Sequence, residues 1–445
     1  MLKHIGLVLK SAINSFWLLP LWLSFFALFL FAATYFVDMR YLGNFFESYP
    51  PPLSIGPSGA RQLLATIAGS LITVASLVFS MTLIALTVAA GNIGARLLLR
   101  YMQNRSIQVT LGVFLAGFIY ALLTLSATGN ETSDVPRLSI FTAMTIAVLC
   151  FVWLVFAFHD LAKSIQVDQA IAELSSSLCS ALKNLLKNCD QAEAVDHELE
   201  LPGKEEGIPV RKIYADRGGY VVSINRAALL EMAEKKDLVV RVQLKLGSFA
   251  LPGELVAEIV CLSQGLDEES VSKWEGEIRS CVIFSSSRND LDDPFFCLRL
   301  LNEIAARAMS PSLNDIYTAV ACVDHVCLGV EYILENGLPR NGWKDSSGQL
   351  RIVFSPYFFD DFVYAAFDQI RHAGMGSPTL TFRLLDRLNR LSQLAKSDHQ
   401  TKCIDRYIER VYSSAREIFS TQADLELLEQ AYEGAKKKNY YFQDI

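Results

Sequence analysis

The first 160 residues alternate long apolar runs with short polar connections. Four of the runs contain no Asp, Glu, Lys or Arg, and each is long enough to cross about 30 Å of hydrocarbon as a helix. They are residues 16–37, 62–95, 107–127 and 138–158. The pattern therefore predicts a membrane α-helical domain with four transmembrane helices over residues 1–160.

Beyond residue 160 the apolar positions recur at the spacing of amphipathic helices and strands. We expect an amphipathic helix and linker over residues 161–206, a small β-rich module over 207–285 and a mainly helical cytosolic domain over 286–445. The predicted fold class is a four-helix membrane domain followed by an α+β cytosolic region, with the β-rich module and a C-terminal helical bundle.

The second apolar run would be about 50 Å long as a helix, which exceeds the thickness of the hydrocarbon core. Hydroxyl side chains recur along it every seventh residue, with small or apolar residues between them on the same face. This stripe consists of Thr66, Ser70, Thr73, Leu77, Ser80, Ile84, Thr87 and Gly91.

Two interpretations of the stripe remain open. Small residues and hydroxyls allow close packing against another helix. Alternatively, several copies of the second span surround a water-filled path, in which Leu77 and Ile84 would be apolar constrictions.

The balance of charged residues changes near residue 160, where the long apolar runs end. Residues 1–160 carry 8 Lys and Arg against 5 Asp and Glu, whereas the remainder carries 32 against 42. The acidic second half argues against nucleic-acid binding, which needs clustered positive charge. The nine cysteines form no C-x-x-C pair, a pattern typical of reduced thiols in a cytosolic compartment.

Positive residues near the ends of the spans predict the orientation. Lys3, Lys10 and the cluster Arg96, Arg100 and Arg105 lie on the same side of the membrane, so both termini are expected to be cytoplasmic. If the second span lines a pore, the three arginines would surround its cytoplasmic mouth and favour anions. The spans contain no internal Asp, Glu, Lys or Arg, which argues against an ion-coupled transporter.

Signals of enzyme or metal chemistry are weak. Four residues of metal-binding type lie close together: Cys322, Asp324, His325 and Cys327. Their directions on a helix diverge, so we expect no metal site. Residues 285–294 hold three aspartates and an arginine, which fit helix caps or, as the alternative, a site for a hard cation or an oxyanion. We find no nucleophile elbow, Walker loop or dinucleotide fingerprint, and expect neither an enzyme nor a cofactor.

Three stretches resemble a known family. They are SMTLIALTVAAGNIGARLLLR at residues 80–100, QVTLGVFLAGFIYALL at 108–123 and AARAMSPSLNDIYTA at 305–319. They resemble the predicted bacterial membrane proteins catalogued as domain of unknown function 2254, over nearly the whole chain. The resemblance implies a bacterial inner-membrane protein and implies no activity.

The third stretch contains a turn formed by Ser310, Pro311, Asn314 and Asp315. Asn314 or Asp315 is expected to cap the helix that follows, and a ligand or subunit contact at the turn is the alternative. The chain departs from the family pattern here, because Ser312 and Ile316 stand where Gly and Pro are frequent.

Two functional hypotheses follow. The first is an oligomeric passive ion channel or mechanosensitive-type pore lined by the second span, with ions, membrane lipid and further copies of the chain as partners. The second is a non-conducting, membrane-anchored scaffold or sensor whose cytosolic region binds a partner or ligand. An enzyme acting on lipid is a third, for which the sequence offers no catalytic pair.

Overall fold

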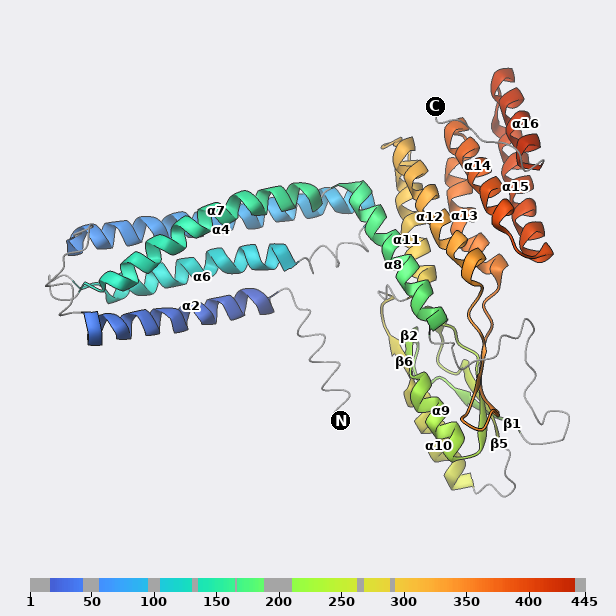
Figure 1. The fold of residues 1–445 in the computed structure, drawn as a ribbon, viewed down its shortest axis with the longest axis horizontal. Coiled ribbons are helices and arrows are strands. Elements are labelled where there is room, and N and C mark those ends of the chain that lie inside the picture. Colours follow the sequence, from blue (N-terminus) through green and yellow to red (C-terminus); the bar gives the residue numbers. More distant parts are fainter. Residues whose placement is uncertain are drawn as a thin grey trace. The chain divides into compact units, whose positions relative to one another are not determined.

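The computed structural model describes residues 17–42, 56–94, 105–129, 135–164, 166–187, 210–261, 268–288 and 293–436. The chain divides into two compact units, Met1–Gln169 and Ala170–Ile445. The first unit consists of long helices, and the second combines helices with two β-sheets (Figure 1).

The helices of the first unit are α2 (Leu18–Val37), the π-helical turn η1 (Asp38–Leu42), α4 (Pro57–Ile93), α6 (Arg105–Ala127) and α7 (Arg137–Ser164). In the described part of the chain, five helices are long and apolar enough to cross a membrane. They are these four long helices and α12 (Ile316–Asn336) of the second unit. Helix α4 starts five residues before the predicted span, because Pro57 fits the first turn of a helix.

Helix α6 contacts α2, α4 and α7 (Figure 1). Two of its glycines make the close approaches. A Cβ on Gly112 would lie 2.6 Å from Leu23 Cδ1 of α2. A Cβ on Gly117 would lie 3.1 Å from Leu71 Cδ1 of α4 and 3.2 Å from Ile146 Cγ2 of α7. The absence of a side chain at these positions lets α2, α4 and α7 pack closely on α6.

The described residues of the second unit form two β-sheets. The strands are β1 (Val210–Tyr214), β2 (Gly219–Ile224), β3 (Leu238–Val242), β4 (Phe249–Ala250), β5 (Leu255–Cys261), β6 (Val282–Ser285), β7 (Gly342–Lys344) and β8 (Leu350–Phe354). The five-stranded sheet has the order β1-β5-β3-β8-β7, in which only β3 and β8 are parallel, and the three-stranded antiparallel sheet has the order β4-β2-β6. Helices α9 (Arg226–Lys235) and α10 (Glu268–Cys281) pack on the sheets around buried Leu229, Val240 and Ile278.

The sheet extends beyond the β-rich module predicted over residues 207–285. Strands β7 and β8 come from the segment expected to be mainly helical, and Val240 of β3 pairs with Ile352 of β8. A boundary at residue 285 therefore does not separate the sheets from the later helices.

The other helices of the second unit are α8 (Val167–Lys187, which begins at the unit boundary), α11 (Pro294–Ala308), α12, α13 (Phe359–Gly374), α14 (Pro378–Leu394), α15 (Asp398–Ile418) and α16 (Gln422–Lys436). Helix α12 packs against α11, α13 and α14. The amphipathic α8 buries Ile171, Leu174 and Leu178, and Leu178 fills the space beside Gly329 of α12.

Polar residues at the helix starts act as caps. The side chain of Asn225 accepts a hydrogen bond from Ala228 N in α9, and Asp315 accepts one from Thr318 N in α12. In the loop before α11, Asp293 accepts a hydrogen bond from Phe295 N at 3.0 Å and caps that helix. Asp290 and Asp292 of this loop lie outside the described residues.

The buried Asp293 is also paired with Arg288, whose Nε and Nη2 donate to Oδ2 at 2.9 and 2.6 Å. Burial raises the pKa of the Asp293 carboxyl and outweighs the opposing effect of Arg288. Gly247 leaves room for this pair: its φ is +77°, and a Cβ there would lie 2.0 Å from Asp293 Oδ2. The loop aspartate thus serves as a cap held by an ion pair.

We expect Gly247→Ala to destabilise the second unit more than Gly253→Ala. Both glycines have positive φ, but a Cβ on Gly253 would meet nothing within 4 Å. Gly253→Ala should cost about 1 kcal/mol of backbone strain, whereas Gly247→Ala should cost about 3 kcal/mol, because it also displaces the buried ion pair. Labelling of the buried thiol of Cys261 during a urea titration of the full chain measures both. Equal midpoints for the two variants would contradict the proposed role of Gly247.

Candidate functional site: the outward face of α4

One face of α4 packs against the rest of the first unit. Its buried members are spaced by three, four or, between Val78 and Ala85, seven residues: Ala60, Leu64, Ala68, Leu71, Ala75, Val78, Ala85, Ala89 and Ile93. The spacing is that of a helix that buries a single stripe.

The eight stripe residues predicted from the sequence lie on the other side of α4. All eight are exposed on the surface of the chain: Thr66, Ser70, Thr73, Leu77, Ser80, Ile84, Thr87 and Gly91. They are displaced by two residues from the buried set, which is a rotation of about 200° around a helix. The stripe therefore does not pack against another span of the same chain, and we call it the outward face of α4.

The outward face differs in composition from the exposed surfaces of the neighbouring helices. Helix α2 exposes Leu21, Trp22, Phe25, Phe26, Phe29 and Phe36, and α7 exposes Phe141, Val148, Leu149, Phe151, Val152, Val155 and Phe156. Large apolar side chains of this kind suit contact with lipid. The eight positions of the outward face of α4 are mainly hydroxyls and small residues, interrupted by Leu77 and Ile84, which are 49% and 61% exposed. Beside this stripe α4 also exposes large apolar side chains: Ile72, Phe79, Met81, Leu83 and Val88.

The threonine hydroxyls of the outward face bond to their own helix. Thr66, Thr73 and Thr87 each donate to the carbonyl oxygen four residues earlier, at 2.7–2.8 Å. Each hydroxyl oxygen keeps lone pairs that can accept a hydrogen bond from water or from a neighbouring chain. The threonine hydroxyl hydrogens thus have acceptors even in a contact without water, and the hydroxyl oxygens can also accept hydrogen bonds from water.

The predicted cytoplasmic-mouth residues are only partly described. Arg105 is the first residue of α6 and is exposed, whereas Arg96 and Arg100 lie outside the described residues. Helix α4 ends at Ile93, and Gly94 follows with a φ of 111°.

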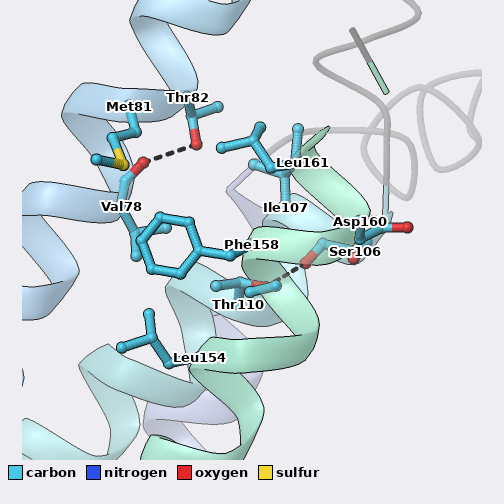
Figure 2. Close-up of a pocket in the computed structure, with 11 residues that line it drawn as sticks. Val78, Met81, Thr82, Ser106, Ile107, Thr110, Leu154, Phe158, Asp160 and Leu161 are labelled. Atoms are coloured by element: carbon cyan, nitrogen blue, oxygen red, sulfur yellow. Dashed lines mark hydrogen bonds between the residues drawn. The ribbon is translucent and has the colours of Figure 1, made fainter. Parts of the chain in front are cut away.

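A small hollow with room for about one water molecule lies between α4, α6 and α7, where residues 78–82 of α4 face the start of α6 and the end of α7 (Figure 2). It is lined by Val78, Met81, Thr82, Ser106, Ile107, Thr110, Leu154, Ala157, Phe158, Asp160 and Leu161. Near it, Trp153 Nε1 of α7 donates to Thr110 Oγ1 of α6 at 3.1 Å. We call this space the α4/α6/α7 hollow.

Sequence reasoning missed a polar cluster at the opposite end of the first unit. Asp38 of η1 is buried, and its carboxylate accepts hydrogen bonds from Leu138 N at 2.9 Å, Ser139 N at 2.9 Å and Ser139 Oγ at 2.8 Å. It therefore caps the start of α7, about one hundred residues away in the chain. The hydroxyl groups of Thr34 and Tyr120 are 2.8 Å apart within the same part of the unit.

The apolar run that ends at residue 37 predicts a polar connection from Asp38 onward. The structure continues the helix through η1 instead. The sequence did offer a signal for this cap. An aspartate stands at the end of the first span, and the fourth span begins near Leu138 and Ser139.

The predicted family-motif turn belongs to the second unit. Pro311, Asn314 and Asp315 are exposed, Ser310 Oγ lies 3.2 Å from Ser312 Oγ, and Asn314 has a φ of 46°. Asp315 caps α12 through Thr318, to which its carboxylate is joined by two hydrogen bonds. The turn thus has a structural role as a cap, and its exposure leaves the contact alternative open.

Comparison with known proteins supplies a family. The family model described as "Predicted membrane protein (DUF2254)" matches residues 13–390, which confirms the resemblance seen in the sequence. The chain is similar to the uncharacterized proteins Mb1321c of Mycobacterium bovis and Rv1290c of Mycobacterium tuberculosis. Each is 25% identical over 373 residues, covering 83% of this chain and 70% of the relative. No solved structure matches the chain.

We expect Asp38→Ala to destabilise the first unit by about 2 kcal/mol, because it leaves the first backbone N–H groups of α7 without their acceptor. Asp38→Asn should be intermediate, since one side-chain oxygen remains. Labelling of the buried Cys150 thiol with rising temperature, quantified by peptide mass spectrometry, reports on this unit. The neighbouring exposed Met39, changed to Ala, is the control. If Asp38→Ala matched this control, the cap would be irrelevant to stability.

Proposed function

We propose that the chain, which belongs to the family described as "Predicted membrane protein (DUF2254)", acts in the membrane as an oligomeric passive ion channel lined by α4. Several copies of the chain would place the outward faces of their α4 helices around a shared aqueous path. The proposal needs no cofactor, metal or catalytic residue.

The observation that carries the proposal is the exposure of all eight stripe residues on the side of α4 that the chain's own fold leaves uncovered. From Thr66 to Gly91 the outward face is about 38 Å long, enough to run through the whole hydrocarbon core. Hydroxyl oxygens along this length can accept hydrogen bonds from water. Leu77 and Ile84 would form apolar constrictions of the kind that gate by dewetting.

We assign the spans to α2, α4, α6 and α7 and place α12 in the cytosolic region. Helix α12 is apolar enough to span, but Asp324 on it accepts hydrogen bonds from Arg383 Nε at 2.9 Å and Arg387 Nε at 2.7 Å, both on α14. Its contacts with α11, α13 and α14 favour the interior of a C-terminal helical bundle. The protein would lie in the bacterial inner membrane. An even number of spans and the Lys and Arg residues near their ends then make both termini cytoplasmic.

The second unit would act as the cytosolic gate or vestibule. Two residues separate the end of α7 at Ser164 from the start of α8 at Val167. Helix α8 is held in the second unit by Leu178 on Gly329 and by a 3.5 Å hydrogen bond from Ser175 Oγ to His325 O. A displacement of α7 would therefore reach the second unit through a short connection.

A non-conducting scaffold or sensor is the second candidate, and the threonine geometry favours it. Since Thr66, Thr73 and Thr87 already donate to their own helix, the outward face needs no water and can form a dry contact between copies. In that case the second unit would bind a partner or ligand.

We expect Ser80→Leu and Thr87→Leu each to reduce the unitary current of the purified full-length protein in planar bilayers by about tenfold, because an added apolar ring dewets the path. Thr145→Leu is the matched control: Thr145 is exposed on α7 and donates to Phe141 O at 2.9 Å, as the outward-face threonines do to their own helix.

The number of subunits, counted for the same variants in nanodiscs, separates the two candidates. A reduced current from an intact oligomer supports the channel. An unchanged current in both variants excludes the lumen assignment, and loss of the oligomer in both favours the dry contact.

A further inference from the structure

We propose that the carboxylate of Asp38 closes a clasp between α2 and α7, and that this clasp opens when the bilayer is thin. The clasp consists of Thr34 of α2, Asp38 of η1, Tyr120 of α6, and Leu138 and Ser139 of α7. It lies within a single copy of the chain and uses neither the outward face of α4 nor an oligomer. The inference therefore applies to a channel and to a sensor alike.

The polar groups of the clasp form one connected network. The carboxylate oxygens of Asp38 accept hydrogen bonds from Leu138 N, Ser139 N and Ser139 Oγ at 2.8–2.9 Å. Tyr120 Oη lies 2.8 Å from Thr34 Oγ1 and 3.4 Å from Ser139 O. The network thus joins the end of α2 to both α6 and α7, and its Tyr120 and Ser139 are fully buried.

The amides at the start of α7 report directly on the clasp. The N–H groups of Leu138 and Ser139 belong to the first turn, where a helix has no backbone acceptor of its own, and Asp38 supplies the acceptor instead. Ile140 N, by contrast, donates to Pro136 O at 3.0 Å. Opening of the clasp therefore releases the first two amides, whereas unwinding of α7 releases all three.

Helix α2 is the member of the clasp that the bilayer can displace. It has 20 residues and is about 30 Å long, which matches the hydrocarbon core of an average bilayer. Only two of its residues are buried, and Leu23 against Gly112 of α6 holds its first half. A thinner bilayer tilts a helix of this length. The end at Asp38 lies far from the contact at Gly112, so the tilt displaces that end from α7.

The position of Asp38 along the chain makes an open state accessible. Asp38 directly follows the first charge-free run, so a released carboxylate reaches the interface, where water replaces the lost donors. The clasp is therefore a contact with two states, and the tilt of α2 shifts the balance between them. It connects a helix that faces lipid to α7, whose other end at Ser164 leads to α8.

The test follows hydrogen exchange of the full-length protein in nanodiscs of dioleoyl or dimyristoleoyl phosphatidylcholine, of which the second forms the thinner bilayer. Exchange is read at single residues by mass spectrometry. We expect the amides of Leu138 and Ser139 to exchange about tenfold faster in the thinner bilayer, while Ile140 stays protected. Asp38→Ala should make the exchange of the first two amides fast and equal in both bilayers.

Ser139→Ala removes one of the three hydrogen bonds to Asp38 and should speed the exchange of Leu138 in the dioleoyl bilayer by about threefold. Thr145→Ala is the matched control and should behave as the wild type, because the Thr145 hydroxyl donates to Phe141 O within α7. Equal exchange of the wild-type Leu138 and Ser139 amides in the two bilayers would overturn the clasp. Faster exchange of Ile140 together with them would also overturn it, since α7 itself would then be unwinding. Both results come from the wild-type chain and do not depend on the folding of a variant.

Discussion

The packing of α4 on α6 is the constraint on which the other features of the first unit depend. Gly117 lets Leu71 approach the backbone of α6, and the alanines spaced along α4 continue the contact. When the buried stripe of α4 packs against α6, the residues two positions further along lie on the opposite side of the helix. They point away from the chain's own helices, whether they are polar or apolar. The fold thus determines which face is outward but does not account for its hydroxyls.

The helices of the membrane unit could be predicted from the sequence because their signals are local. A run without charges of sufficient length is a property of neighbouring residues, and the four predicted runs correspond to α2, α4, α6 and α7. Which face of α4 is buried could not be predicted. Alanine and leucine on one side, and threonine, serine and glycine on the other, are both compatible with helix contacts in a membrane. Only the positions of Gly117 and Leu71 decide between the two faces.

The features that sequence reasoning missed depend on contacts between distant residues. Asp315, one of the two residues expected to cap α12, could be found from the sequence because a cap bonds three residues ahead in its own helix. Asp38 caps a helix about one hundred residues later, and β8 joins β3 across a similar separation. Helix α12 shows the converse: its apolar composition resembles a span, yet Asp324 and the packing on α14 tie it to other helices of the second unit.

The side chains of the outward face bear on the choice between an aqueous path and a dry contact. Two helices in direct contact benefit from small residues at every position of the shared stripe, because each larger side chain separates the backbones. Leu77 and Ile84 interrupt the small residues at points where such a contact would be tightest, and both project freely from the chain. In helices arranged around an axial opening the same two side chains meet no neighbour backbone and instead narrow the path between hydrated segments. Leu77 and Ile84 are not the whole apolar surface of α4, because Ile72, Phe79, Met81, Leu83 and Val88 are exposed beside the stripe and suit contact with lipid.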